Sequence, residues 1–300
     1  SGSNSLEILQ KVEESLAGRV RVIEVLSLSF SEYLLFKDEK LWQLQQNIQM
    51  PVSNSLVAPL NQALQEYLIY GGLPRVALTN NYHEKVEMLN DIYQTYLLRD
   101  VRMFIANEHF VGFNKLLRLL ATQIGNLLNI NELSRECGLP YKKCEEYIHL
   151  LQQMYIIKLI EPFHSNTRKV IGRMNKIYFC DVGLRNMIHN SFNEITYRTD
   201  NGALFENYCL LELWRKKQTT GTIHFYRTTN GTEIDFIILK PDEIKAVECK
   251  YKSLEKPISI PSMNGFCDEQ NITQRYLVNT ALTTEFKGVS FVSAIILDRI

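Results

Sequence analysis

The spacing of apolar residues divides the chain into a helical first third, a mixed middle and a strand-rich last third. In the first third, apolar residues three and four positions apart are typical of helices that bury one face. These runs predict helices over residues 5–16, 29–36, 60–70 and 82–104. A β-branched run over 20–26 predicts a strand between the first two helices. Gly71 and Gly72 end the third helix, because glycine tolerates the backbone of a helix stop.

The middle of the chain has the element order of a winged helix. Helical spacing stops at Gly138 and Pro140 and resumes over 141–154, and β-type runs follow at 155–160 and 176–179 around a polar loop. In winged helices the last helix enters a DNA groove, and neighbouring loops contact the backbone. The pattern therefore predicts either a DNA-binding domain or a rigid spacer that contacts protein.

Charge in this middle region favours the loop over the helix as a DNA contact. Residues 106–199 hold 12 Lys and Arg against 8 Asp and Glu, whereas 1–105 hold 9 against 12 and 200–300 hold 12 against 13. Lys142 and Lys143 of the last helix are candidates for DNA contact, but two adjacent glutamates offset their charge. The better candidates for phosphate ligands are the cations in and beside the loop: Arg168, Lys169, Arg173 and Lys176.

The last third predicts a sheet covered on both faces. A helix over 203–214 comes first. Strand-like runs follow it at 222–227, 232–239, 244–251, 274–279 and 291–297. A helical or irregular crossover separates the third run from the fourth. Such an order predicts a mixed sheet flanked by helices.

A tight turn between the second and third of these strands sets their register. Pro241 suits the second position of a type I turn, so Lys240 is expected to pair with Glu243. This pairing puts Asp235 directly opposite Glu248, and the two-residue alternation of strands brings Lys250 out on the same face. Carboxylates that face each other across a ladder repel unless a cation lies between them.

Both faces of this hairpin are otherwise apolar. Alternation gives the face of Asp235 the side chains of Ile237 and Ala246, and gives the opposite face Ile234 and Phe236. The carboxylates are therefore expected to be partly enclosed, where an unpaired charge is costly.

Glu206 adds a third carboxylate, since its own helix has no basic residue three or four positions away. Asp235, Glu248 and Glu206 are the predicted ligands of Mg²⁺ or Mn²⁺, which prefer oxygen donors. Lys250 is expected to orient or deprotonate the attacking water, or to stabilise charge on the phosphate. Glu206, Asp235, Glu248 and Lys250 together have the arrangement of a PD-(D/E)xK metal-dependent nuclease site.

Composition narrows the class of protein. At 300 residues, 45% hydrophobic and 22% charged, the chain is long enough for two or three cores. No apolar run approaches the roughly 18 residues of a membrane helix, and no secretory signal opens the chain, so we expect a cytoplasmic protein without membrane contact. Single cysteines and scattered histidines predict reduced thiols and no local zinc site.

A series of short motifs along nearly the whole chain resembles one family. They are GSNS at 2–5, LAGR at 16–19, SLSFSE at 27–32, GGLP at 71–74, LRD at 98–100, YFCDVGL at 178–184, LFE at 204–206, FYR at 225–227, GTEID at 231–235 and ECK at 248–250. This family comprises prokaryotic AAA-type ATPases whose C-terminal domain of unknown function contains a winged helix and a nuclease-like fold.

The resemblance implies an α/β multidomain chain in four parts. These are a remnant of the ATPase core (1–36), a helical lid or bundle (37–105), a winged helix (106–185) and a restriction-endonuclease-like mixed sheet flanked by helices (186–300). The chain lacks the family's phosphate loop, G-x-x-x-x-G-K-[ST], so we expect it to be part of a longer protein and ATP to be bound by that parent alone. Arg19 resembles a nucleotide-sensing arginine, and the ATPase portion implies a homo-oligomer.

Competing functions follow from these features. The leading hypothesis is a metal-dependent nuclease, acting on DNA and attached to an ATPase that remodels or licenses it. The alternative is a non-catalytic module that binds DNA or a protein partner. In a third interpretation the N-terminal remnant makes the chain a nucleotide-dependent regulator whose C-terminal domain is structural.

Overall fold

The computed structural model of the chain describes residues 24–49, 54–163, 174–216, 221–228 and 231–300. The expected helix over 5–16 lies outside these ranges, as does most of the expected strand over 20–26. Residues 24–26 are described, and they belong to no strand.

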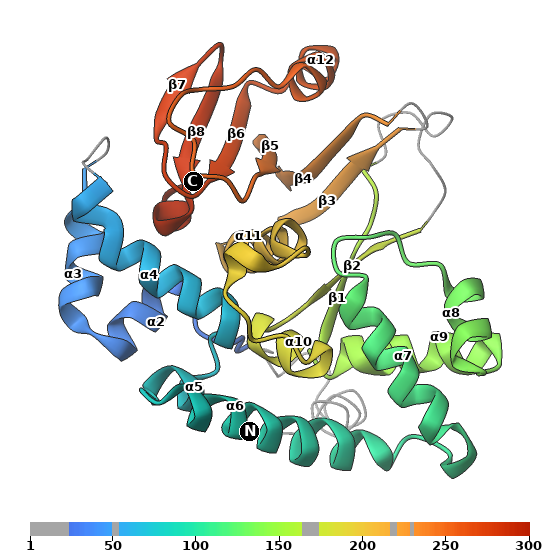
Figure 1. Cartoon of the computed structure of the whole chain (residues 1–300). Coiled ribbons are helices and arrows are strands. Elements are labelled where there is room, and N and C mark those ends of the chain that lie inside the picture. The colour runs from blue at the N-terminus through green and yellow to red at the C-terminus, as the bar shows by residue number, and fades with distance from the viewer. Residues whose placement is uncertain (1–23, 50–53, 164–173, 217–220, 229–230) are drawn as a thin grey trace, which may run out of the picture.

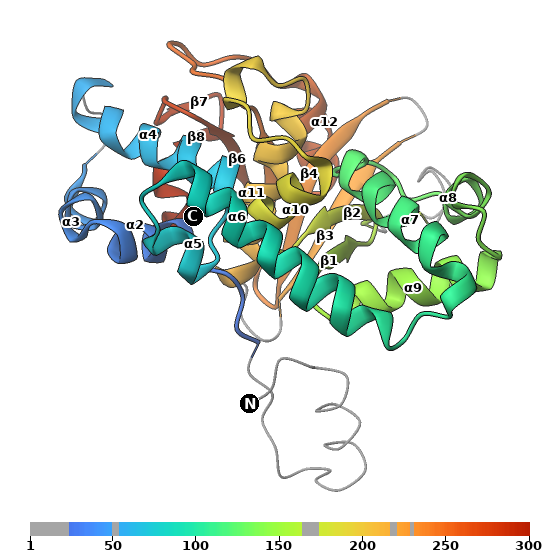
Figure 2. The same ribbon diagram turned by 60° about the horizontal axis from the view of Figure 1, so that its bottom comes forward.

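The first described part is helical, as its spacing predicts. Its elements are α2 (Phe30–Lys37), α3 (Glu39–Asn47), α4 (Asn54–Tyr70), α5 (Pro74–Leu78), α6 (Tyr82–Ile92) and η1 (Tyr93–Asp100). Ser29 and Glu32 begin α2 as a capping box, in which each side chain accepts a hydrogen bond from the other's backbone N–H. The expected helix over 82–104 is divided, because η1 winds as a π-helix. Figure 2 shows α6 and η1 as one long rod.

The middle part contains the expected helices and strands in the expected order. Its elements are η2 (Asn107–His109), α7 (Phe110–Thr122), α8 (Ile130–Cys137), α9 (Tyr141–Gln153), β1 (Ile157–Ile160), β2 (Lys176–Phe179) and α10 (Val182–His189). Gly138, at φ 67°, ends α8 in the left-handed conformation. Strands β1 and β2 pair antiparallel, with Lys158 opposite Tyr178, and every residue of β2 is buried.

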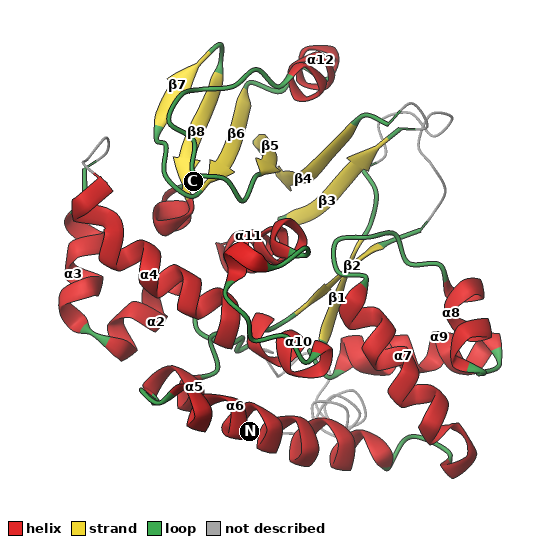
Figure 3. Ribbon diagram, in the orientation of Figure 1, coloured by secondary structure: helices red, strands yellow, loops and turns green. Residues whose placement is uncertain are grey.

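The last part forms a mixed sheet with a helix on each face. Its elements are η3 (Ile195–Tyr197), α11 (Asn201–Lys216), β3 (Thr222–Arg227), β4 (Glu233–Lys240), β5 (Glu243–Cys249), α12 (Pro261–Glu269), β6 (Gln274–Asn279), β7 (Thr284–Phe286), β8 (Val289–Ser293) and η4 (Ala294–Arg299). Within the described ranges the strand order is β3-β4-β5-β6-β8-β7, parallel at β5–β6 and β6–β8. Figures 1 and 3 show α11 and α12 on opposite sides of this sheet. The mixed α/β expectation is confirmed.

The last expected strand ends earlier in the structure than the sequence predicts. The run over 291–297 is strand only to Ser293, after which η4 turns as a 3-10 helix. η4 packs against the first helices, because the Arg299 side chain donates to the carbonyl of Ile48 at 2.7 Å. The end of the described chain is therefore anchored on its beginning.

One hydrophobic cluster runs through all these parts. It extends from Leu28 to Leu297 and includes residues of α4, α7, α9, α11 and the sheet. A second cluster lies between the sheet and α12, and a third lies around Tyr70 and Leu89. In the ranges described, no helix is long and apolar enough to cross a membrane. All six cysteines lie in these ranges and are free thiols, as expected.

Two glycine-containing segments cross at the centre of the molecule. Gly71 follows α4 with φ 77°, and Gly183 lies in the first turn of α10. A Cβ added to Gly183 would lie 2.0 Å from the carbonyl oxygen of Tyr70. The Asp181 carboxylate joins the segments, because its Oδ2 accepts from the Gly72 N–H and its Oδ1 from the Leu184 N–H, both at 2.9 Å. The motifs at 71–74 and 178–184 thus form one structural junction.

Candidate acidic site

The β4–β5 hairpin has the predicted register. Lys240 pairs with Glu243, and the ladder continues to the pair of Phe236 and Val247. One position further, regular pairing stops at Asp235, whose Oδ2 accepts the Cys249 backbone N–H at 2.7 Å. Asp235 therefore takes a ladder hydrogen bond with its side chain.

A β-bulge lies at Asp235. Between two regular pairs of β3 and β4, Phe225 faces both Asp235 and Phe236. Ile234 and Ile237, three positions apart, consequently belong to the same cluster beneath α12. The expectation that Ile234 shares a face with Phe236 is wrong, because the bulge interrupts the alternation between them.

Asp235 and Glu248 are both enclosed, and neighbouring charges affect the pKa of each carboxylate. Asp235 is buried at 9% exposure, and the Glu248 side chain is 14% exposed. Burial, and then the charges of Glu206 and Glu248, raise the pKa of Asp235 well above its usual value. Burial also raises the pKa of Glu248, against the lowering effect of Lys250. Asp235, Glu248 and Glu206 thus lie within electrostatic range of one another.

Glu206 has partners that sequence reasoning missed. Its Oε1 accepts from the Lys176 Nζ at 3.0 Å and from the phenol of Tyr178, both on β2. Residues two apart on a strand share a face, so the KIY segment of β2 presents both donors to α11. This pairing explains how a helix without a nearby base tolerates Glu206.

Lys176 is a buried member of the acidic site. It is 1% exposed, and its Nζ also lies 2.7 Å from a carboxylate oxygen of Glu233. Although burial acts to lower it, the pKa of Lys176 is raised by Glu206, Asp235 and Glu233. This placement does not fit the expected phosphate contact, because an enclosed ammonium between two carboxylates does not reach DNA at the surface. A charged residue inside a fully buried strand was the signal for this role.

Two of the other cations predicted to contact DNA lie on α9. Lys143 forms an exposed ion pair with Glu146 at 2.6 Å, which fits the expected cancellation of charge on α9. Lys142 is exposed on the same helix. The remaining candidates, Arg19, Arg168, Lys169 and Arg173, lie outside the described residues.

The donor atoms around Asp235 and Glu248 determine whether a divalent ion fits this site. Among the described residues, no three His, Cys, Asp or Glu side chains are grouped closely enough to hold an ion as they stand. One carboxylate oxygen nevertheless lacks a hydrogen-bond partner, since Glu248 Oε2 is buried and accepts no hydrogen bond. Its other oxygen lies 3.2 Å from the Lys250 Nζ. Asp235 and Glu248 therefore fit an oxygen-binding ion, whereas Oε1 of Glu206 is occupied by Lys176.

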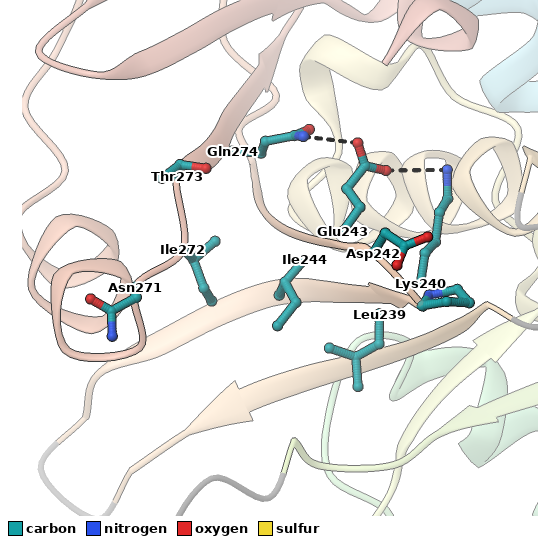
Figure 4. Close-up of a pocket in the computed structure, with 10 residues that line it drawn as sticks. Leu239, Lys240, Asp242, Glu243, Ile244, Asn271, Ile272, Thr273 and Gln274 are labelled. Atoms are coloured by element: carbon teal, nitrogen blue, oxygen red, sulfur yellow. Dashed lines mark hydrogen bonds and ion pairs between the residues drawn. The ribbon is translucent and has the colours of Figure 1, made fainter.

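A hollow of about 590 Å³ lies at the other end of the hairpin (Figure 4). It is lined by the hairpin turn and by the loop before β6. Glu243 is the central acid there, and it is already satisfied by Gln274 at 2.8 Å and Lys240 at 3.4 Å. This hollow is separate from Asp235 and Glu248, and its central carboxylate, Glu243, is already paired.

A second buried carboxylate lies near the end of α11. Glu212 Oε1 accepts from the Phe30 N–H at 3.1 Å and from the Arg215 Nη1 at 2.7 Å. Arg215 also donates to the carbonyl of Ser27. Burial raises the pKa of Glu212 from 4.5 to about 7, although Arg215 acts to lower it. α11 is thus fastened to residues 27–30.

Stability is expected to fall between about pH 5 and pH 8 because of Glu212. A pKa raised on folding gives stability that is complete below pH 4.5 and is lost as the pH passes about 7. The shift corresponds to at most about 3 kcal/mol, at about 1.4 kcal/mol per unit. Urea unfolding across this range should show a steeper fall in the native protein than in Glu212→Gln. Parallel pH profiles for the two proteins would contradict the assignment.

Family models match two stretches of the chain. Residues 61–194 match one domain of unknown function (DUF8612), and residues 201–295 match another (DUF4143). The second stretch contains Glu206, Asp235, Glu248 and Lys250, whereas Lys176 belongs to the first. The acidic site therefore combines side chains from both.

Similar proteins occur in archaea and bacteria, and all are described as uncharacterized. One from Methanocaldococcus jannaschii is 28% identical, covering 85% of this chain and 59% of its own. One from Haemophilus influenzae is 24% identical, with coverages of 84% and 58%. One from Mycobacterium tuberculosis is 21% identical, with coverages of 79% and 48%. The chain thus spans about half or somewhat more of these relatives. No solved structure matches it significantly.

Proposed function

We propose that the acidic site binds Mg²⁺ or Mn²⁺ and cleaves phosphodiester bonds in DNA. The observation that carries the proposal is the buried, unpartnered Oε2 of Glu248, on the strand antiparallel to that of Asp235. Mutual repulsion in an enclosed setting favours a cation between such groups. Oxygen donors select hard divalent ions.

The reaction is a hydrolysis. A water oxygen forms a bond to phosphorus, the bond from phosphorus to the leaving sugar oxygen breaks, and that oxygen takes up a proton. A bound divalent ion lowers the pKa of water and neutralises phosphate charge. Asp235 and Glu248 would hold this ion. Lys250, whose side chain is 38% exposed beside Glu248, is positioned to stabilise the charge that develops on the phosphate oxygens.

We further propose that a longer parent protein supplies ATP hydrolysis. Domains like that matched by residues 201–295 are often found with AAA-type ATPases. The chain covers 48–59% of the length of its relatives cited above, which leaves room for an ATPase portion in proteins of that length. In such a parent, ATP-driven rearrangement would govern the access of DNA to the acidic site.

The test is metal-dependent nicking of supercoiled plasmid. Cleavage is expected with Mn²⁺ or Mg²⁺ and not with EDTA. Asp235→Asn is expected to slow it about a hundredfold or more, because removing a metal ligand removes both ion and rate. Lys250→Ala is expected to lower the rate while Mn²⁺ binding persists. The matched control is Asp242→Asn in the exposed hairpin turn, which should cleave like the native protein.

Thermal unfolding supplies a second readout that does not need DNA. Mn²⁺ is expected to raise the melting temperature of the native protein more than that of Asp235→Asn, since a ligand that binds only the folded state stabilises it. Without metal, Asp235→Asn is expected to be the more stable protein, because it removes the repulsion from Glu248. If Mn²⁺ neither stabilises the protein nor supports cleavage, the nuclease proposal falls.

The ion pair between Glu206 and Lys176 favours a second candidate function. With Lys176 pairing two of the nearby carboxylates, the fold is complete without an ion, as in a non-catalytic module that binds DNA or protein. DNA contact in that case rests on Arg168, Lys169 and Arg173. A log–log salt slope of roughly −2 to −3 in DNA binding would support it, at about 0.9 per phosphate contact.

A further inference from the structure

A lysine from outside the sheet domain occupies the acidic site. Lys176 begins β2, in the stretch that precedes α11 and the six-stranded sheet, and it contacts carboxylates from both of these. Its Nζ lies 3.0 Å from Glu206 of α11 and 2.7 Å from Glu233 of β4. Its ammonium also lies 5.6 Å from the centre of the Phe225 ring on β3. A single cation thus joins three elements around the site.

Because Lys176 is buried, its charge depends on the carboxylates that pair with it. A buried ammonium is stable only when its charge is matched, and here the matching charges are Glu206 and Glu233. Glu206 is held twice over, because the Tyr178 phenol donates to the same oxygen. Glu248 Oε2, in contrast, is buried without a partner. Lys176 therefore neutralises Glu206, whereas Glu248 keeps one oxygen without a partner.

We propose that Lys176 is a resident cation that competes with the divalent metal for Glu206 and so sets the metal affinity of the site. This inference rests on the proposed metal-binding function. Two cations at one carboxylate repel, so metal binds weakly while Lys176 keeps its place. Full metal coordination by Glu206, Asp235 and Glu248 requires the Lys176 ammonium to withdraw from Glu206.

Because the backbone of Lys176 belongs to β2, withdrawal of its ammonium from Glu206 is coupled to a movement of that strand. Lys176 pairs with Ile160 of β1, and its backbone also forms a bridge to Leu127. The β1 end in turn contacts the sheet edge, where the Phe163 N–H donates to the Phe225 carbonyl at 2.6 Å. Lys176 is therefore a positioning residue through which the β1–β2 pair controls metal loading.

Calorimetric titration of the whole chain with Mn²⁺ tests the inference. Lys176→Met is expected to bind Mn²⁺ about tenfold more tightly than the native protein, the equivalent of one modest ion pair. Lys176→Gln keeps an N–H donor for Glu206, so it guards against a folding failure, and the same direction is expected. Lys85→Met is the matched control. Lys85 is likewise fully buried, and its Nζ lies 3.4 Å from the Glu66 carboxylate. Its acidic partner is not one of the carboxylates of the acidic site.

The outcomes separate this inference from the proposed function. Tighter Mn²⁺ binding by both Lys176 variants, native affinity in Lys85→Met and weaker binding in Asp235→Asn support it. If the folded Lys176 variants bind Mn²⁺ like the native protein while Asp235→Asn weakens it, the competition is refuted and the metal site stands. If no protein in the series binds Mn²⁺, the metal site itself is refuted, and the inference with it.

Discussion

Gly183→Ala is expected to destabilise the protein by about 3 kcal/mol or more, the largest effect of any glycine substitution at the central junction. The added Cβ would lie 2.0 Å from the carbonyl oxygen of Tyr70 and 2.8 Å from the Gly71 nitrogen nearby. These are backbone atoms, which no side-chain rotation relieves. Overpacking of a rigid contact costs roughly 1–3 kcal/mol and sometimes more. Chemical denaturation monitored by circular dichroism measures the loss.

Gly265→Ala, in helix α12, is expected to change the stability in the opposite direction and stabilise the protein. Gly265 is exposed in α12, and a Cβ there would meet no atom within 4 Å. Alanine is favoured over glycine inside a helix by roughly 0.5–1 kcal/mol, so this variant should be slightly more stable than the native protein. If both substitutions had similar small effects, the close crossing of α4 and α10 would be wrong.

Asp200→Asn is expected to cost about 3–5 kcal/mol, because it leaves two buried guanidinium groups without their counter-charge. Asp200 accepts two hydrogen bonds from Arg198, at 2.8 and 2.7 Å, and one from Arg185. Arg185 is fully buried and is also held by the carbonyl of Ala121 at 2.7 Å. Removing the charge strands Arg185 inside the core, and urea denaturation should report the loss.

Acid should reproduce part of this effect. Although burial acts to raise it, the pKa of Asp200 is held well below its usual range by hydrogen bonds from Arg198 and by the charge of Arg185. A depressed pKa gives stability that is present above the ordinary value of 3.8 and is lost as the pH falls below it. The control is Asp268→Asn, at an ion pair whose carboxylate is 69% exposed. Its expected cost is below about 1 kcal/mol.

Local rules were sufficient for the hairpin that carries the acidic site. Pro241 and the alternating residues on either side of it set the pairing of Lys240 with Glu243, and the structure has that pairing. The start of α2 was equally local, since Ser29 caps it with Glu32. Contacts within a few residues of each other depend on backbone preferences that the sequence carries directly.

Long-range contacts account for what the sequence did not reveal. Lys176 pairs with Glu206 across 30 residues, and the choice depends on how β2 packs against α11. The bulge at Asp235 depends on the neighbouring strand β3, whose Phe225 bonds instead to residues 161 and 163. No spacing rule within one strand contains that information. The need of Glu206 for a partner was predictable, but the identity of the partner was not.

Helix α11 has a mechanical consequence for the site. Glu206 lies in its first half, and Glu212 and Arg215 near its end hold the backbone of Ser27 and Phe30. At about 1.5 Å per residue, the 16 residues of α11 make a rod of roughly 24 Å. A hydrogen-bonded helix transmits displacement along its axis, so a pull on residues 27–30 that kept these bonds would drag Glu206 past Lys176. If the acidic site binds a divalent ion as proposed, force on residues 27–30 would therefore change whether Glu206 pairs with Lys176 or with that ion.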